Sequence, residues 1–353
     1  MRWRGGAGGS SVRGSHRGGA GIRKAMILGV VAVGLGMGGW RRPAHAAWPD
    51  SPSTNLPVCT ASGEQRFPSA ASDSAGGMYV AWEDSRGGAT TKLIYLQRIL
   101  NTGQIAPGWV AQGIMVCPST GRQHGPKCVS DRHGGVIVAW TGAGGGVSPG
   151  GTYAQRFDSA GTIKWAGGGV GFGLTGGCGG LETIEDGRAG VIAAWDDCRN
   201  YSVTNPNDIY AGRVDSAGVA VWGAGGVPIC TLQGGQAEAV LVSDGAGGAI
   251  VAWLDVRDLG TLEGDIYGQR ISANGTCLWA TNGIPICAAP GRQDSPSIAT
   301  DHAGGAYVAW TDKRSDPNGD VYLQHILPSG ARDPLWPENG LAVAATSAYE
   351  MYS

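Results

Sequence analysis

The stretch DHAGGAYVAWTDKR, at residues 301–314, returns in related form four more times along a chain of 353 residues. The other copies begin at Asp73, Asp131, Asp186 and Asp244. Each copy joins a D-x-x-[GA]-G segment to an apolar run that ends near a tryptophan. Glycine favours a tight turn because it reaches positive φ without steric cost, and a short apolar run is typical of a buried strand. The stretch therefore predicts a β-hairpin that occurs five times.

Other residues recur in a constant order with this hairpin. Its tryptophan returns every 55–58 residues, at Trp82, Trp140, Trp195, Trp253 and Trp310. A tyrosine in an I-Y-x-Q-R-like segment follows, and then a second tryptophan, at Trp109, Trp165, Trp222, Trp279 and Trp336. Such a period is typical of the four-stranded blades of a β-propeller, because one blade cannot bury its faces without neighbours. We predict an all-β propeller of five blades of about 57 residues closed into a ring, with a truncated six- or seven-blade propeller as the alternative.

The N-terminal segment, residues 1–46, has the features of a signal peptide with a basic n-region. Arg23 and Lys24 precede an apolar, glycine-rich run of about 16 residues, shorter than a typical membrane span, and Ala44-His45-Ala46 offers a small-residue cleavage site. We predict a secreted, periplasmic or cell-surface protein whose residues 47–353 form a single propeller domain. Its predicted units are residues 66–111, 123–165, 179–222, 236–279 and 293–336.

Removal of residues 1–46 changes the charge balance. That segment holds eight basic residues and no acidic ones, so 18 basic residues remain against 28 acidic ones. An acidic domain is a poor partner for nucleic acid or for an anionic membrane surface. We therefore expect no nucleic-acid partner and no membrane span in the mature chain.

Two repeated phrases carry a resemblance to a known class. D-x-x-G-G-x-x-V-A-W and I-Y-x-Q-R-x-D-x-x-G-x-x-x-W together resemble the repeats of secreted bacterial β-propeller proteins, over residues 48–345. The turn also distantly resembles the Asp-box of sialidase-type propellers, although its glycine falls three residues after the aspartate instead of two. The resemblance implies the propeller fold, and its sialidase side implies glycoside hydrolysis as an alternative function.

Most charged and aromatic residues occupy repeated positions, which indicates a structural role. Ten of the 11 tryptophans after residue 46 occupy the two repeated positions and predict an aromatic core between blades, with none left for a sugar-binding platform. Asp84 and Arg86, two apart on one strand, share a face, as do their counterparts in three other copies. We expect Arg98, on the next strand, to lie opposite these carboxylates in a structural ladder.

The cysteines predict one disulfide. Cys178 replaces a glutamine found in the other four copies, and Cys198 lies the same distance beyond the hairpin centre at Arg188. Paired strands place them opposite each other, so we predict a Cys178–Cys198 disulfide, which suits an oxidising compartment. Cys117 could pair with Cys128. Otherwise it joins a set predicted to pack as small buried hydrophobes, at Cys59, Cys117, Cys230 and Cys287.

Functional residues are expected where the units differ, near the mouth of the central channel. The candidates for ligand binding are His124, Lys127, Glu182, Glu238 and Asp294. A solvated channel lining accounts for them equally well. Asp316, Asn318 and Asp320 alternate as the first ligands of a calcium loop do, but the loop lacks the following glycine and the distal glutamate. Turn formation also explains these residues, so calcium is a weak candidate and no other cofactor is expected.

These features favour binding over catalysis. We predict a secreted, non-catalytic propeller that serves as a binding or cell-surface scaffold for an extracellular protein or glycan of unknown identity. The alternative is a propeller-type, sialidase-like glycoside hydrolase. Such an enzyme needs two carboxylates beside one bond, and each candidate carboxylate here comes from a different blade.

Overall fold

The computed structural model describes residues 55–88, 91–118, 121–144, 147–173, 176–261 and 263–344. All of them belong to one of the two compact units of the chain, His45–Ser353. The predicted signal peptide, residues 1–46, lies outside this range. In these described segments no helix is long and apolar enough to cross a membrane.

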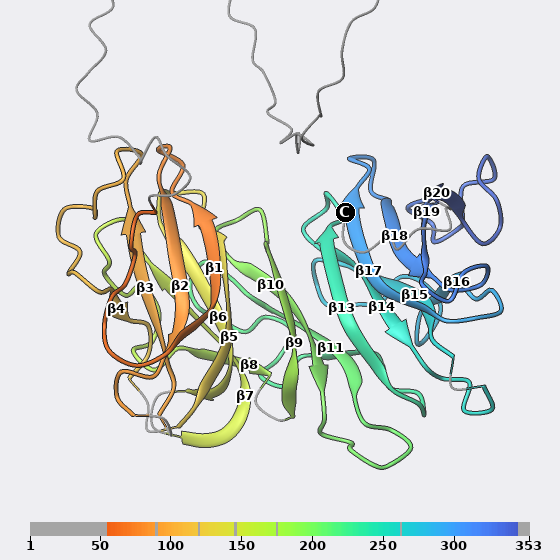
Figure 1. Ribbon diagram of the computed structural model, residues 1–353, viewed down its shortest axis with the longest axis horizontal. Coiled ribbons are helices and arrows are strands. Elements are labelled where there is room, and N and C mark those ends of the chain that lie inside the picture. The colour runs from red at the N-terminus through yellow and green to blue at the C-terminus, as the bar shows by residue number, and fades with distance from the viewer. Residues whose placement is uncertain are drawn as a thin grey trace, which may run out of the picture. The chain divides into compact units, whose positions relative to one another are not determined.

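Five four-stranded antiparallel sheets confirm the predicted blades (Figure 1). Each blade, numbered 1 to 5 along the chain, consists of four consecutive strands whose order in the sheet is their order in the chain. The strands are β1 (Gln65–Ser72), β2 (Met78–Asp84), β3 (Leu93–Ile99), β4 (Ile114–Met115), β5 (Gln123–Ser130), β6 (Val136–Gly144), β7 (Val147–Phe157), β8 (Val170–Gly173), β9 (Gly177–Glu185), β10 (Val191–Asp197), β11 (Asp208–Val214), β12 (Val227–Cys230), β13 (Gln236–Ser243), β14 (Ala249–Asp255), β15 (Asp265–Ile271), β16 (Ile284–Cys287), β17 (Gln293–Thr300), β18 (Ala306–Asp312), β19 (Asp320–Ile326) and β20 (Leu341–Ala344).

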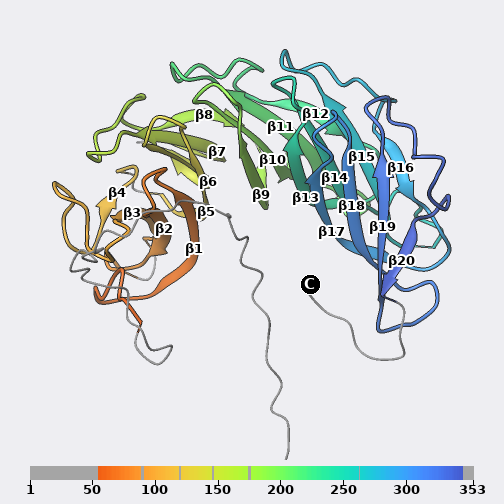
Figure 2. The ribbon, with the colours of Figure 1, turned by 90° about the horizontal axis from the view of Figure 1, so that it is seen from above.

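The first strands of successive blades, β1, β5, β9, β13 and β17, lie next to one another and form the inner surface. Figure 2 shows the blades following one another in an arc with β1 and β17 at its two ends. The expected closure of these five blades into a ring is therefore wrong.

The turn between the first two strands of a blade is held by its aspartate. In blade 1, Asp73 Oδ1 accepts hydrogen bonds from the N–H groups of Ala75 and Gly77, both at 2.8 Å. A side chain at Gly77 would bring its Cβ within 2.3 Å of the Ile99 carbonyl oxygen, so glycine is required there. The remaining oxygen, Oδ2, pairs with Arg98 Nη2 at 2.9 Å.

The pairing of Arg98 with Asp73 corrects the expected ladder. In the register of β2 with β3, Arg98 lies opposite Tyr79, at the turn end of the strand, whereas Asp84 lies at the other end. Asp84 instead accepts hydrogen bonds from Trp82 Nε1 at 2.9 Å and Arg86 Nη2 at 2.6 Å. The Asp84–Arg86 part of the prediction is thus confirmed, and the pairing of Arg98 with the same carboxylate is not.

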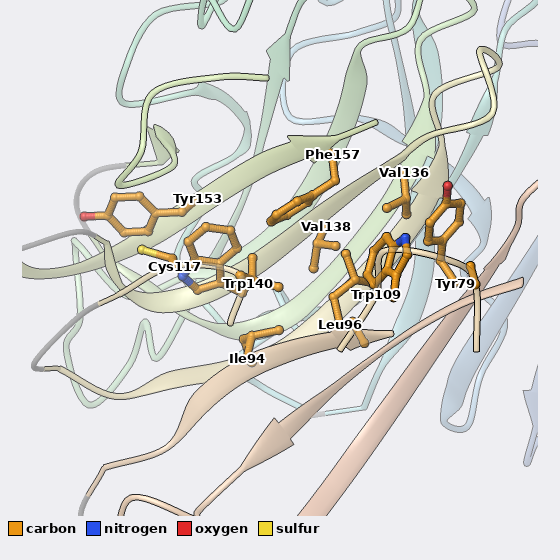
Figure 3. Packing of buried hydrophobic residues seen from close by; sticks show 13 residues of the cluster. Tyr79, Ile94, Leu96, Trp109, Cys117, Val136, Val138, Trp140, Tyr153 and Phe157 are labelled. Atoms are coloured by element: carbon orange, nitrogen blue, oxygen red, sulfur yellow. The ribbon is translucent and has the colours of Figure 1, made fainter. Parts of the chain in front are cut away.

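Apolar side chains pack between successive blades, as predicted. Figure 3 shows this layer between blades 1 and 2, where Leu96 and Trp109 of blade 1 face Val138 and Phe157 of blade 2. Trp109 also donates a hydrogen bond from Nε1 to the carbonyl of Ser159 in blade 2, at 3.1 Å. The second tryptophans of blades 2, 3 and 4 make the same contact with the blade that follows. These tryptophans therefore join blades rather than form a binding site.

The predicted Cys178–Cys198 disulfide is present, with the two Cα atoms 5.8 Å apart. Cys117 and Cys128 are free thiols, so the alternative pairing of these two residues is wrong. Cys117, Cys230 and Cys287 are fully buried, while Cys59 is partly buried. Burial raises the pKa of the Cys230 thiol to about 12, which suits an unreactive packing residue.

Candidate functional site

Each inner strand carries a β-bulge at the same place, one step after its first paired residues. The register with the second strand breaks there in all five blades. The residue in the bulge has a left-handed backbone in every case, at Phe67 (φ 50°), Gly125 (57°), Gly180 (57°), Glu238 (57°) and Ser295 (53°). A bulge changes the direction of a side chain relative to the regular alternation of the strand. The residue type at the bulge therefore determines which side chain is presented on the inner surface at that point.

A cavity of about 620 Å³ lies over this bulged end of the inner strands. Its polar lining residues include Glu83, His124, Lys127, Glu182 and Glu238. Its apolar lining includes Phe67, Leu181, Val240 and Pro296, together with several glycines. The volume falls within the range of roughly 300–1,000 Å³ that is usual for small-molecule sites.

One ion pair and one histidine–carboxylate contact cross from blade to blade in this pocket. Lys127 Nζ of blade 2 lies 2.5 Å from Glu182 Oε1 of blade 3, and both side chains remain more than one third exposed. His124 Nδ1 of blade 2 lies 3.6 Å from Glu83 Oε1 of blade 1. The pocket thus combines side chains from neighbouring blades.

Glu83 is the most buried ionisable group of the lining, with 3% of its surface exposed. Its Oε1 accepts a hydrogen bond from the N–H of Gly125 at 2.9 Å. Its Oε2 is buried without a hydrogen-bond partner, and the nearest cation, Lys92 Nζ, lies 3.9 Å away. A buried carboxylate oxygen without a donor is unusual and costly.

A second buried carboxyl lies behind the pocket wall. A side chain built on Gly180 would bring its Cβ within 2.4 Å of the Asp196 carboxyl group, so this group lies directly beneath the bulge of blade 3. Burial raises the pKa of Asp196 to about 6, helped by the nearby Glu238 carboxylate and opposed by the N–H groups of Glu238 and Ala239. Asp196 occupies in blade 3 the position that Glu83 occupies in blade 1.

The structure brings four of the five predicted site residues together, namely His124, Lys127, Glu182 and Glu238. Asp294 is not among the lining residues. It is engaged by Arg292 Nε at 2.7 Å and Lys313 Nζ at 3.1 Å, and only 9% of its surface is exposed.

Sequence comparison of the repeats overlooked two lining residues, Phe67 and Glu83. Phe67 is 60% exposed, although it belongs to one of the most apolar residue types. A signal for it exists in the sequence, because blades 2 and 3 place glycine at the bulge position where blade 1 has phenylalanine. Glu83 lies at the variable position between the core tryptophan and Asp84, and alignment of the copies marks that position as well.

The calcium candidates are arranged as a turn. The Oδ1 atom of Asp316 accepts a hydrogen bond from the N–H of Asn318 at 2.8 Å, and Asp320 is 3% exposed at the start of β19. Across the described residues there is no group of three or more His, Cys, Asp or Glu side chains that could hold a metal ion. Calcium binding at this loop remains a weak prediction.

The fold and the pocket define a class: a β-propeller protein with a ligand-sized pocket on its inner strands. No family model and no curated protein matches the chain. Among solved structures, the chain is similar to a protein of unknown function from Dyadobacter fermentans, with a TM-score of 0.47 and 11% identity over 78% of this chain and 82% of that one. It is also similar to a Hadza microbial sialidase, with a TM-score of 0.41 and 12% identity over 76% of this chain and 57% of that one. A third similar structure is the GH93 α-L-arabinofuranosidase of Fusarium graminearum, with a TM-score of 0.41 and 11% identity over 78% of this chain and 82% of that one. These low similarities concern the fold and say nothing about activity.

Proposed function

We propose that this protein is a secreted, non-catalytic binding module that takes an extracellular ligand, either a glycan or part of a protein, in the inner pocket. The basic and apolar features of residues 1–46 support secretion. The convergence of side chains from all five blades on a cavity of suitable volume supports binding.

The observation that carries the proposal is the left-handed backbone of Phe67 and Glu238. A residue other than glycine in this conformation costs about 1–3 kcal/mol, and such residues cluster at functional sites. Blades 2 and 3 avoid the cost with Gly125 and Gly180. Blades 1, 4 and 5 accept it, at Phe67, Glu238 and Ser295, and the first two of these side chains line the pocket. Glycine would relieve the strain at Phe67 and Glu238, so the retention of two larger side chains in the pocket lining supports a role for them in binding.

A ligand screen tests this proposal. Glycans and small polar molecules are added to the full chain, and amide NMR signals of the pocket residues are followed. We expect at least one ligand class to shift these signals in the wild-type protein and not in Phe67→Gly, while Tyr201→Gly, which removes an aromatic ring that is 68% exposed on the β10–β11 loop, binds normally. A panel in which no ligand shifts the pocket signals would contradict the proposal.

Glycoside hydrolysis is a second candidate because three carboxylates from three blades, Glu83, Glu182 and Glu238, line one pocket. A hydrolase needs one protonated and one ionised carboxyl group beside the scissile bond. Binding ranks first for two reasons. Glu182 is already paired with Lys127, and the carboxyl group with a raised pKa, that of Asp196 at about 6, lies beneath Gly180 instead of lining the pocket. Release of nitrophenol from a panel of aryl glycosides, lost in Glu182→Gln or Glu83→Gln but kept in Glu338→Gln, would reverse this order.

A further inference from the structure

We propose that the inner pocket recognises an ammonium group carried on an aliphatic stem. This inference rests on the proposed function, since it names the chemical class of ligand for the same pocket. Three independent features of the lining support it: its charge, a buried carboxylate oxygen without a donor, and an exposed aromatic ring.

The charge of the lining favours a cation. Three carboxylates, Glu83, Glu182 and Glu238, face one ammonium, that of Lys127, and this ammonium is already paired with Glu182. With His124 neutral, the lining carries two more negative than positive charges. A concave surface lined by one sign of charge concentrates ligands of the opposite sign. An anionic ligand is correspondingly disfavoured.

Glu83 supplies the second feature. Its Oε2 is buried and accepts no hydrogen bond, although Lys92 Nζ forms an ion pair with it at 3.9 Å. A ligand N–H group that reached this oxygen would remove the penalty of leaving it unsatisfied. An ammonium group offers three donors and no acceptor, so its chemistry suits a lining rich in carboxylates.

Phe67 supplies the third feature. Its ring is 60% exposed, and an aromatic face attracts a cation within about 6 Å of its centre. The ring has no polar atom with which to hydrogen-bond a neutral sugar hydroxyl. Leu181, Val240 and Pro296 add apolar surface that suits the methylene groups of a stem. The combination fits a cationic head on an aliphatic chain better than a polyhydroxylated ligand.

Three probes with the same five-carbon chain test the charge requirement: cadaverine, 1,5-pentanediol and glutarate. Each is titrated into the full chain, with amide signals of the pocket residues as the readout. We expect cadaverine to bind at least tenfold more tightly than 1,5-pentanediol, and glutarate not to bind. The affinity for cadaverine should fall as salt is added, because screening weakens attraction between exposed charges.

Matched variants test the residues. Phe67→Leu keeps apolar volume without the ring, and Glu238→Gln keeps shape without the charge. Each should weaken cadaverine binding at least fivefold. The controls are Tyr201→Leu and Glu338→Gln, which alter an aromatic ring 68% exposed and a carboxylate side chain 83% exposed outside the pocket, and they should leave binding unchanged. Far-UV circular dichroism checks that all four variants remain folded.

The outcomes separate this inference from the proposed function. If 1,5-pentanediol or glutarate binds as tightly as cadaverine and depends on Phe67, the pocket is a binding site and the ammonium class is overturned. If cadaverine binds Phe67→Leu and Glu238→Gln as tightly as it binds the wild-type protein, or if no probe shifts the pocket signals, the inference fails. The wider ligand panel alone then decides the proposed function. If cadaverine binds as expected, titrations with Nα-acetyl-lysine amide and glucosamine distinguish a lysine side chain of a protein from an amino sugar as the natural ligand.

Discussion

Side chains at the same three repeat positions meet on the forward face of blade 1 and of blade 5, where the forward face is the one turned towards the next blade along the chain. In blade 1 they are Tyr79, Arg98 and Trp109, and blade 2 covers them, so that Tyr79 is fully buried and Trp109 is 7% exposed. In blade 5 the corresponding residues are Tyr307, His325 and Trp336. Tyr307 is 36% exposed, since no sixth blade follows in the part of the chain that the structure describes.

On the face of blade 1, all three side chains donate hydrogen bonds to backbone carbonyls of blade 2, at Gly134 for Tyr79 and at Ser159 for Arg98 and Trp109. Arg98 Nη1 reaches into blade 2 and donates to the carbonyl of Ser159 at 2.9 Å. His325 stays within blade 5, between Asp301 at 3.0 Å and Asp333 at 2.9 Å. The turn aspartate keeps a basic partner in both blades, but of the two basic residues only the arginine also links two blades. The comparison shows that the repeat sequence specifies which three side chains meet on the forward face. The neighbouring blade determines how far they are buried and how much they contribute to the free energy of unfolding.

The largest difference is expected between the two tryptophans. Trp109→Ala should lower the free energy of unfolding by about 4 kcal/mol, because it opens a cavity between two blades and removes the hydrogen bond to Ser159. Trp336→Ala should cost about 1 kcal/mol, since its ring is only partly covered. Guanidinium unfolding followed by far-UV circular dichroism measures both values. Equal losses would show that blade 5 is as well covered as blade 1.

Arg98→Ala should cost about 3 kcal/mol, because it leaves the buried Asp73 carboxylate without its counter-charge. His325→Ala should cost about 1 kcal/mol at pH 7, because it breaks no contact with another blade and Asp333 can be hydrated. The same unfolding experiment applies, with Arg98→Lys as a variant that keeps the charge and should recover part of the loss. A larger loss for His325→Ala would refute the contrast.

A pH effect is expected in blade 5 and not in blade 1. Burial alone would lower the pKa of His325, but hydrogen bonds to Asp301 and Asp333 outweigh it and hold the pKa above its ordinary value of 6.5. The stabilisation by His325 is therefore fully present below pH 6.5 and is lost as the pH rises through the folded-state pKa. Wild-type protein should lose stability as the pH rises from 6.5 through the folded-state pKa of His325, relative to His325→Arg, whose guanidinium does not titrate. Parallel curves for the two proteins would contradict this expectation.

The smallest effect concerns the bulge, which blades 1 and 5 share. Phe67→Gly and Ser295→Gly should each raise the free energy of unfolding by about 1 kcal/mol, because glycine relieves the left-handed strain at φ 50° and 53°. Only Phe67→Gly should also abolish ligand binding, since Ser295 does not line the pocket. Stability from chemical denaturation and binding from the ligand panel are measured on the same samples. Loss of stability in Phe67→Gly would mean that the ring is a packing residue.

The register of strands limited what could be predicted from the repeats. The order of Tyr79, Asp84 and Arg98 along the chain is visible in the sequence, but the partner of Arg98 depends on which end of β3 meets the turn. A two-residue period gives the face of a strand and not the position along it. The pairing of Arg98 with Asp73 therefore had to come from the structure, whereas that of Arg86 with Asp84, two residues apart, did not.

The sequence by itself determined the features that depend on nearby residues. The blade period, the aspartate turn at Asp73 and its counterparts, the buried tryptophans and the Cys178–Cys198 disulfide all follow from local spacing, turn chemistry and strand alternation. Only the tertiary structure decided the open arc of five blades, the exposure of Phe67 and the meeting of Glu83, Glu182 and Glu238 in one pocket. These features depend on how neighbouring blades stack and on the backbone conformation of the bulges. Both are determined by contacts between residues that are distant in the sequence.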